Sequence, residues 1–556
     1  MPDLRIGDTV SLTVEKYDPS RDSAPRLETY QVPYTKEMRV LEALDYVVEE
    51  LGESLSYQWF CGVKKCGMCG VMVNGRQTLG CWEPVQPEML VRPLAGFPVV
   101  RDLVIDRSQY FANVQSIDPW IKRKRPYAGF PEAITGAELS AAADTMHCIE
   151  CMLCVSACPA NGERFMGPAP MVQLARYALD PRDEADRAST ALAPGGIDHC
   201  VGCRQCSHVC PAGIRVFEGA IEGLNRQIRE SGSAGPRTRR SKFFAGIHDI
   251  ARLACRVAPL ANWAGRRKMV RRVLEAVLGI DRRRALPTFA SVPFDRWFAG
   301  RANRVGDAPS VVLFHDTFVT YFEPGIGRAR GPVVDSGGYS AGLADGRGCC
   351  GRPMLSEGAE DDARAAAEHN VRILAPIVQR GIPIVGFEPS CVSMVRDTYP
   401  ELVGDDDARL VAGGIVTFEE FVATESKAGR FTLRKTGAPE RILVHGHCHQ
   451  KAMNAVDSVL EALALTGAER IDEIPTTCCG MAGSNGYETE HYERSLEAAE
   501  AALFPAVRAA PDCAEIAAAG TSCRQQIRTG TGRNARHPAQ ILADVLDRAA
   551  AVDHPA

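Results

Sequence analysis

Apolar and polar side chains alternate in two short stretches near the N-terminus, residues 10–14 and residues 28–32. This period of two is typical of a β-strand with one buried face. Residues 40–48 instead carry apolar side chains at spacings of three and four, the period of an amphipathic helix. We therefore expect residues 1–115 to form a small domain of sheet and helix.

The C-terminal half carries one pattern twice. The first copy, residues 309–430, has a strand in VVLFHD, then GCCGRP, then a strand that ends in GFEPSC. The second copy, residues 431–556, has ILVHGHCH, then CCGMAG, then IAAAGTSC. Ala-rich helical stretches such as EDDARAAAEHNVRILAPIV lie between the strands. Strands that alternate with helices predict two α/β domains, with ligands gathered at the carboxyl ends of the strands.

A basic stretch, residues 236–308, connects the two halves and is expected to be helical. Its apolar residues recur at helical spacing: Leu253, Val257, Leu260, Val270, Val273, Leu274, Val277 and Leu278. Cations lie among them: Arg266, Arg267, Lys268, Arg271 and Arg272. One interpretation is an amphipathic helix on an anionic membrane surface. The other, which we favour, is a helix that packs between two domains with its Arg side chains in water.

Composition narrows the class of protein. Hydrophobic residues make up 45% and charged residues 24% of the 556 residues, as in soluble globular proteins of several domains. A net charge of -5 gives no indication of a nucleic acid partner. The N-terminal stretch lacks the apolar core of a signal peptide, and no apolar run reaches about 18 residues. We expect a cytoplasmic protein, at most peripheral at the inner face of a membrane.

The 21 cysteines fall mostly in clusters, which indicates metal ligation in a reducing compartment rather than disulfides. Two runs share the spacing C-x2-C-x2-C-x3-C-P, the pattern of two-cluster ferredoxins, in which the fourth cysteine serves the other cluster. One [4Fe–4S] cluster is then expected on Cys148, Cys151, Cys154 and Cys210. The other is expected on Cys158, Cys200, Cys203 and Cys206. A zinc site would instead need separated C-x2-C pairs.

A further ligand loop lies in the N-terminal domain. Its cysteines have the plant-type [2Fe–2S] spacing: Cys61, Cys66, Cys69 and Cys81. Gly62, Gly67 and Gly70 allow the loop backbone to pass close to sulfide and to direct N–H groups toward it. We therefore expect a [2Fe–2S] cluster in residues 1–115.

Residues 8–230 resemble the iron–sulfur subunit of the succinate dehydrogenase and fumarate reductase family. The resemblance rests on VEKYDPSRDSAPRLETYQVP, VLEALDYV, CGVKKCGMCGVMVNGRQTLGC, PLAGFPVVRDLVID and FMGPAPMVQLARYALDPRDE. It implies a β-grasp ferredoxin domain over residues 1–115 and an all-α domain with two [4Fe–4S] clusters over residues 116–235. It also implies electron transfer between these clusters and a flavin on a separate catalytic subunit.

The chain departs from the familiar members of that family in its second cysteine run. Those members lack a cysteine at the position of Cys203 and carry a [3Fe–4S] centre, so Cys203 predicts a second complete [4Fe–4S] cluster. Val201 and Ala160-Asn161 stand where those members place a histidine and aromatic residues of a quinone pocket. A quinone site of the usual kind is therefore not expected.

The CC pairs of the C-terminal copies resemble the cysteine-rich (CCG) domains of heterodisulfide reductase, whose complete copies supply five cysteines each. Here Asp316 and Glu388 replace two cysteines in the first copy, and Gly520 replaces one in the second. The second copy keeps enough for one metal or iron–sulfur cluster: Cys448, Cys478, Cys479 and Cys523. The first keeps a sulfur-poor set that leaves metal binding open: Cys349, Cys350 and Cys391.

Several roles in these copies stay open. His447 and His449 flank Cys448 and can ligate a metal, move protons or serve the fold. Asp316 can contribute to a metal site or cap the following helix. Cys255 and Cys513 lie outside every pattern, and we expect them to be buried or inert.

The C-terminal half also resembles the C-terminal iron–sulfur module of FAD-linked D-2-hydroxyacid dehydrogenases. The matching stretches are LFHDTFVTYFEP, GFEPSCVSMVRDTYP, HGHCHQKA, CCGMAGSNGYETEHY and SCRQQIRTGTGRNARHP. The fused layout is similar to the iron–sulfur subunit of thiol:fumarate reductase. Because the five-cysteine sites used there for thiols are incomplete here, a quinone or another carrier is the expected partner at the C-terminal end.

These features predict an electron-transfer subunit of a succinate dehydrogenase or fumarate reductase-type flavoprotein. No G-x-G-x-x-G fingerprint for a flavin or nucleotide is present, so we expect no catalytic residue here and a substrate site on an FAD-containing partner. A quinone or a membrane anchor is a further partner to consider. The alternatives are an iron–sulfur subunit of a 2-hydroxyacid or glycerol-3-phosphate dehydrogenase, and a non-enzymatic iron–sulfur redox sensor.

Overall fold

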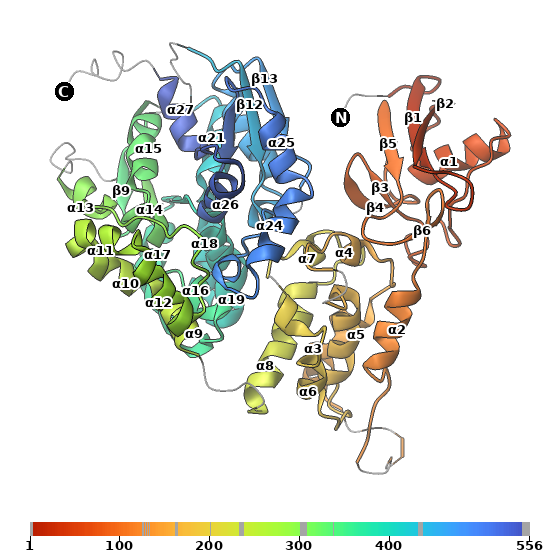
Figure 1. The fold of residues 1–556 in the computed structure, drawn as a ribbon, viewed down its shortest axis with the longest axis horizontal. Coiled ribbons are helices and arrows are strands. Elements are labelled where there is room, and N and C mark those ends of the chain that lie inside the picture. The colour runs from red at the N-terminus through yellow and green to blue at the C-terminus, as the bar shows by residue number, and fades with distance from the viewer. Residues whose placement is uncertain are drawn as a thin grey trace. The chain divides into compact units, whose positions relative to one another are not determined.

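The computed structural model describes residues 4–124, 127, 129–130, 132, 134–161, 165–200, 202–232, 238–300, 309–336, 338–431, 437–476 and 478–546. The chain forms two compact units, residues 1–235 and residues 236–556, and each is described by itself (Figure 1). The predicted boundaries near 235 and 308, and Val201, fall outside the described residues. The division of the chain into five domains stays a prediction.

The first unit begins with a five-stranded sheet in the order β2-β1-β5-β3-β4. Its strands are β1 (Thr9–Lys16), β2 (Arg26–Pro33), β3 (Gly70–Val73), β4 (Arg76–Leu79) and β5 (Glu88–Arg92). The two predicted strands pair antiparallel from Thr9 with Pro33 to Lys16 with Arg26. Helix α1 (Val40–Glu49) buries its predicted apolar face against the inward side chains of β1, including Leu12. A two-stranded ribbon, β6 (Val99–Arg101) and β7 (Val104–Ile105), follows.

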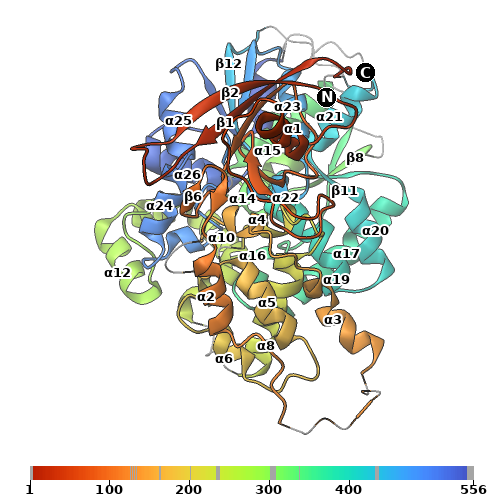
Figure 2. The ribbon, with the colours of Figure 1, turned by 90° about the vertical axis from the view of Figure 1, so that its right-hand side faces the viewer.

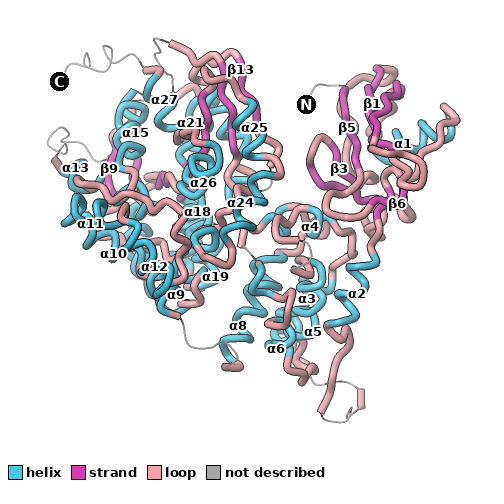
Figure 3. Tube along the Cα trace, viewed as in Figure 1, coloured by secondary structure: helices cyan, strands magenta, loops and turns pink. Residues whose placement is uncertain are grey.

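The rest of the first unit is helical in the described residues, whereas its strands all lie in the N-terminal part (Figure 3). The helices are α2 (Ser108–Ser116), α3 (Gly136–Met146), α4 (Leu153–Ser156), α5 (Pro168–Ala178), α6 (Arg187–Ala191), η1 (Ile197–His199), α7 (Gln205–His208), η2 (Val216–Ile221) and α8 (Glu222–Glu230). Helix α5 is buried along most of its length and is central to this part, with Met171 and Leu174 fully buried. Several of the cysteines predicted as ligands pack on this core, next to the short helices.

The second unit begins with helices that cover part of the first copy. They are α9 (Arg239–Ala245), α10 (Ile247–Ala254), η3 (Cys255–Val257), α11 (Ala258–Gly265), α12 (Lys268–Leu278) and α13 (Phe294–Ala299). The first contacts α16 (Arg352–Ser356), and α13 contacts α15 (Pro324–Ser336), so the basic stretch is joined to the first copy. The predicted apolar stripe, in contrast, is not buried along α12, because none of the residues of this helix is buried. The expected packing of that stripe between domains is therefore not seen within this unit.

The first copy contains a four-stranded parallel sheet in the order β11-β10-β8-β9. Its strands are β8 (Val311–Phe314), β9 (Ala341–Leu343), β10 (Ile384–Gly386) and β11 (Ile415–Thr417). Its other helices are α14 (Thr317–Tyr321), α17 (Glu360–Gln379), α18 (Pro389–Ser393), η5 (Met394–Thr398), α19 (Tyr399–Leu402), α20 (Asp406–Gly414) and α21 (Phe418–Lys427). Helices α17 and α20 pack against each other beside the sheet (Figure 2).

The second copy repeats the central strands in a three-stranded parallel sheet, order β13-β12-β14. Its strands are β12 (Arg441–His445), β13 (Arg470–Glu473) and β14 (Glu515–Ala518). Its helices are α22 (Cys448–Ala452), α23 (Val456–Ala464), η6 (Asn485–Tyr487), α24 (Tyr492–Glu500), α25 (Leu503–Ala509), α26 (Thr521–Thr531) and α27 (Pro538–Asp544). Strands β8 and β12 take the same central place, which agrees with the predicted α/β duplication.

None of the helices in the described part of the chain combines the length and the apolar composition needed to cross a bilayer.

Candidate metal centres

The Cys61 loop directs backbone N–H groups at its first sulfur. Cys61 Sγ accepts hydrogen bonds from the N–H groups of Val63 at 3.4 Å, and of Lys65 and Cys66 at 3.3 Å. These donors lower the pKa of Cys61 to about 7. Hydrogen bonds to the charged form favour the thiolate, which is the form that ligates metal. The loop therefore stabilises a sulfur ligand by its backbone conformation.

The same loop touches the first of the two cysteine runs. Gly67 has a φ of +70°, and a Cβ atom at this position would lie 2.2 Å from the carbonyl oxygen of Ile149. Arg107 joins the two segments, because its guanidinium donates to the carbonyl oxygens of Gly67 at 3.2 Å and Glu150 at 3.3 Å. The candidate [2Fe–2S] loop and the first cysteine run are thus neighbours in one compact unit.

The two cysteine runs follow the same backbone path. In each run the residues before and after the second cysteine have positive φ: Glu150 and Met152 in the first, Gly202 and Arg204 in the second. Left-handed conformations are uncommon for residues other than glycine, so their repetition at equivalent positions indicates a shared loop geometry. Met152 begins α4 and Arg204 begins α7, and the two helices contact each other.

A cavity lies at the first run, and its walls include a cysteine from the second. Four thiols line it: Cys148, Cys151, Cys154 and Cys210. The remaining walls are largely apolar, with Ala169, Val172 and Ile214 among them. Burial raises the pKa of Cys154 well above its usual value, and the nearby thiols raise it further. Four converging thiols in an apolar pocket fit an iron–sulfur cluster, whose ligands are cysteine thiolates.

The other predicted set is also brought together. Burial raises the pKa of Cys206 well above its usual value, and the nearby thiols of Cys200 and Cys158 add to this effect. Cys158, the fourth cysteine of the first run, thus lies near the second run. Cys203 is buried in the same segment. The cross-over expected from the spacing agrees with these positions.

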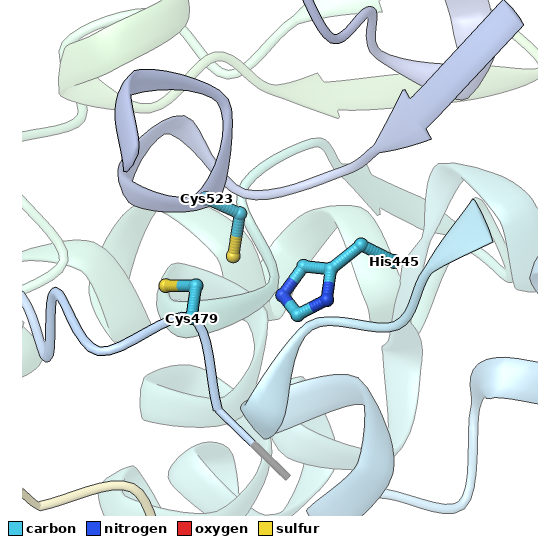
Figure 4. A group of neighbouring side chains, drawn as sticks. All are labelled: His445, Cys479 and Cys523. Carbon is cyan, nitrogen blue, oxygen red and sulfur yellow. The ribbon is translucent and has the colours of Figure 1, made fainter. Parts of the chain in front are cut away.

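In the second copy the four predicted cysteines come together, with one histidine that sequence reasoning missed. The ligand atoms of His445, Cys479 and Cys523 lie within 4.8 Å of one another, and all three residues are buried (Figure 4). The thiols of Cys448 and Cys479 donate hydrogen bonds to Cys478 and lower its pKa. The signal for His445 was its place at the end of the strand in ILVHGHCH, three residues before Cys448.

His447 has a structural role, one of the possibilities left open above. It is the N-cap of α22, and its Nδ1 accepts the backbone N–H of His449 at 3.1 Å. A Cβ atom on Gly520 would lie 2.1 Å from His447 Cδ2, so the imidazole fills the space of the side chain that Gly520 lacks. His447 Nε2 lies 3.8 Å from Glu388 Oε1. The altered positions of the two copies, 388 and 520, are therefore neighbours of one histidine.

Asp316 and His447 occupy the same place in the two copies. Asp316 is the N-cap of α14, and its Oδ1 accepts the N–H groups of Phe318 at 2.8 Å and Val319 at 3.0 Å. The capping role considered for Asp316 is therefore present. The residue that corresponds to Cys448 by its place in the helix is then Thr317, not Asp316.

The three predicted cysteines of the first copy are buried. Cys350 Sγ lies 3.1 Å from Cys391 Sγ, and Thr317 Oγ1 lies 3.9 Å from Cys349 Sγ. In the second copy the ligand atoms of His445, Cys479 and Cys523 lie within 4.8 Å of one another. No such trio is found among the described residues of the first copy. The first-copy metal set stays a prediction.

The two cysteines outside the patterns differ. Cys255 is buried and donates to the carbonyl oxygen of Tyr321 at 3.4 Å. Cys513 is exposed, so of the two expectations, buried or inert, only the second applies to it. The Glu440 carboxylate raises the pKa of Cys513, which favours the less reactive thiol.

Three family models match the chain, and each covers one of these regions. A 2Fe-2S iron-sulfur cluster binding domain matches residues 11–112, and a 4Fe-4S dicluster domain matches residues 144–214. A cysteine-rich domain matches residues 318–396, in the first copy. The chain accordingly carries one [2Fe–2S] and two [4Fe–4S] clusters, and its cysteine-rich region fits a further cluster.

Relatives extend these matches. The fumarate reductase iron-sulfur subunit of Mycobacterium tuberculosis is 38% identical over 217 residues, which are 37% of this chain and 88% of that protein. One subunit of the CoM/CoB fumarate reductase of Methanothermobacter marburgensis is 25% identical, over 85% of this chain and 86% of that subunit. One subunit of the anaerobic glycerol-3-phosphate dehydrogenase of Escherichia coli is 28% identical, over 72% of this chain and 98% of that subunit. The chain belongs to the family of fumarate reductase iron–sulfur subunits.

Proposed function

We propose that this chain is the electron-transfer subunit of a succinate dehydrogenase or fumarate reductase-type oxidoreductase. It exchanges electrons with an FAD-containing partner subunit, which holds the substrate site. The observation that carries the proposal is the contact between the Cys61 loop and the first cysteine run, at Gly67 and Ile149. Two cluster sites that share a boundary within one compact unit suit the passage of electrons from one to the next.

We assign the ligands as follows. The [2Fe–2S] cluster is held by Cys61, Cys66, Cys69 and Cys81. The two [4Fe–4S] clusters are held by Cys148, Cys151, Cys154 and Cys210, and by Cys158, Cys200, Cys203 and Cys206. A further centre is held by Cys448, Cys478, Cys479 and Cys523.

When bound, the clusters supply one-electron oxidation and reduction. The protein supports this chemistry by holding thiolates and excluding water. Backbone N–H groups stabilise the Cys61 thiolate, and Arg107 fixes the loop against the first run. Leu94 and Leu153 are buried beside Gly70, so this part of the boundary between the two sites is apolar. A low-polarity environment strengthens the electrostatic interaction between a charge placed there and the charges around it.

A dehydrogenase of glycerol-3-phosphate or of a 2-hydroxyacid is the second candidate for the partner. The observation in its favour is that the Escherichia coli glycerol-3-phosphate dehydrogenase subunit matches over 72% of this chain. The [2Fe–2S] domain favours the first candidate, because the 38% identical fumarate reductase subunit aligns over 217 residues of this chain and that domain matches residues 11–112.

Native purification under anaerobic conditions tests the proposal. We expect a stoichiometric FAD-containing subunit in the purified complex, and succinate oxidation or fumarate reduction that the Cys148→Ser substitution abolishes. Cys513→Ser is the matched control, because this exposed cysteine lies outside every ligand set. A stable single chain without an FAD partner would contradict the proposal, and activity with glycerol-3-phosphate alone would favour the second candidate.

We further propose that helices α10 to α12 rest on an anionic membrane surface. Seven large apolar side chains there are exposed: Leu253, Val257, Leu260, Trp263, Met269, Val273 and Val277. Residues 252–272 contain seven Arg or Lys residues and no Asp or Glu. An exposed apolar stripe bordered by cations is the pattern of a helix that lies in the membrane interface. Charge complementarity therefore selects an anionic lipid surface.

Vesicle flotation tests this surface with the full-length complex. We expect binding to vesicles that contain phosphatidylglycerol, weaker binding to phosphatidylcholine alone, and at least a tenfold loss on Leu260→Glu with Trp263→Glu. Leu410→Glu is the control, because Leu410 is a partly exposed leucine on α20, away from this stripe. Equal binding by the double variant and the wild type would rule the surface out.

A further inference from the structure

We infer that Nε2 of His445 is a ligand of the metal centre in the second copy, which makes it a mixed thiolate and imidazole site. The inference rests on the proposed function insofar as the thiols of that copy hold a metal. It adds a donor that the cysteine pattern does not contain.

The two nitrogens of this imidazole have different surroundings. His445 ends β12 and is 1% exposed. Its Nδ1 lies 3.0 Å from Thr476 Oγ1, whereas Nε2 is buried and has no hydrogen-bonding nitrogen or oxygen within the described residues. The ring lies beside the sulfurs of Cys479 and Cys523, with ligand atoms inside 4.8 Å (Figure 4). Nε2 thus belongs to the group of thiols.

This arrangement is the one that a metal-ligating histidine needs. Such histidines almost always use their second ring nitrogen for a hydrogen bond that fixes tautomer and orientation. Thr476 supplies that partner to His445. The groups beside Nε2 are thiol sulfurs, which form only weak hydrogen bonds, so a metal is the stronger partner for this nitrogen. The neighbouring histidines are engaged otherwise, since His447 Nδ1 caps α22 and His449 Nδ1 lies 3.2 Å from Ser393 Oγ.

The first copy provides an internal comparison. His445 pairs with Ala518 across the sheet, and the corresponding pair in the first copy is Phe314 with Gly386. Phe314 therefore stands where the second copy has His445, and Thr317 stands where it has Cys448. Two donors of the second copy are thus absent from the first, and the difference points to the second copy as the metal centre.

A neutral imidazole donor brings one negative charge less to the metal than a thiolate at the same position would. In clusters this exchange raises the reduction potential, as it does where histidines replace cysteines in Rieske centres. If the metal is zinc, the same ligand gives a redox-silent site. The donor set is the same in both cases, and the metal content of the purified chain tells them apart.

The test uses the anaerobically purified full-length protein and its own metal. We expect metal beyond the three N-terminal clusters. His445→Ala should lose at least half of this extra iron or zinc, and the EPR signals of the N-terminal clusters should stay unchanged. His445→Cys should keep the metal, with a lower midpoint potential for a cluster or with one less nitrogen neighbour by X-ray absorption for zinc. His449→Ala is the control and should match the wild type.

Two results would overturn the inference. One is the same extra metal and the same spectrum in His445→Ala and His445→Cys as in the wild type. The other is an absence of extra metal in the wild type while the N-terminal signals are intact. Loss of those N-terminal signals in the wild type would instead count against the proposed function. Because His445→Cys retains a ligand, it separates a lost donor from a misfolded chain.

Discussion

At the scale of single residues, Glu419 and His537 show that proximity does not make an ion pair. Glu419 Oε1 lies 3.7 Å from His537 Nε2. Burial raises the pKa of Glu419 to about 8 and lowers the pKa of His537 to about 3, so both groups are neutral at pH 7. The ring contacts agree, since Nε2 donates to the carbonyl oxygen of Phe387 and Nδ1 accepts from the N–H of Ala539.

Glu419→Gln should therefore stabilise the protein at alkaline pH. The folded-state pKa of Glu419 is raised, so its contribution to stability is complete below the unfolded value of 4.5 and is lost as pH rises toward about 8. One pKa unit corresponds to about 1.4 kcal/mol, so the variant should gain up to a few kcal/mol at pH 8 relative to the wild type and little at pH 4.5. Melting temperatures across this range would measure it, and a gain that does not depend on pH would refute the assignment.

At the scale of elements, the N-termini of α22 and α26 meet in the second copy. His447 caps the first helix and Gly520 precedes the second. Glu388, which precedes α18 in the first copy, accepts the backbone N–H of Thr521 at 2.9 Å. The N-termini of α18, α22 and α26 thus lie close together. Glu388 and His447 contact each other there, and Gly520 leaves the space that the imidazole fills.

Gly520→Ala should destabilise the second unit. Its Cβ would lie 2.1 Å from His447 Cδ2, and overpacking of this kind costs about 1–3 kcal/mol. The effect should shrink in a His447→Ala background, although that change by itself removes a helix cap. A double-mutant cycle by denaturant unfolding measures the coupling. Gly413→Ala is the control, because nothing lies within 4 Å of a Cβ there, and additive effects would contradict the packing account.

At the scale of the whole molecule, the two units have different kinds of core. In the helical part of the first unit, the cysteines that we assign as ligands are partly buried against the apolar cluster, and helices α4 and α7 have four residues each. The second unit has parallel sheets that bury continuous apolar strands such as β8. Metal binding contributes more to folding where the ligands themselves form the core.

Removal of the metals should therefore open the first unit before the second. After anaerobic chelation, limited proteolysis followed by mass spectrometry should release peptides from residues 116–232 first, whereas residues 309–546 should stay protected. The four predicted ligand cysteines of the second copy are buried, so loss of their metal should unfold less of the chain. Earlier release of peptides from the second unit would contradict this order.

Local patterns were sufficient for several elements of the fold and for the cysteine spacings that predict the cluster sites. The alternation in residues 10–14 gave a strand, and the spacing in residues 40–48 gave α1 with its buried face. The cysteine spacing determines the short loops, because the left-handed residues between the cysteines and the reach of each thiol are set within a few residues. The duplication was also visible, because each copy repeats its strand, its CC pair and its closing cysteine.

Only the tertiary structure decided which residues share a site across long sequence distances. His445 joins Cys479 and Cys523 because parallel strands and a loop end at the same edge of the sheet. Thr317 replaces Asp316 as the counterpart of Cys448, because helix caps fix the register between the copies. The exposure of the stripe on α10 to α12 depends on what packs against it. Sequence period determines which face of an element is apolar, but contacts between distant segments determine what that face meets.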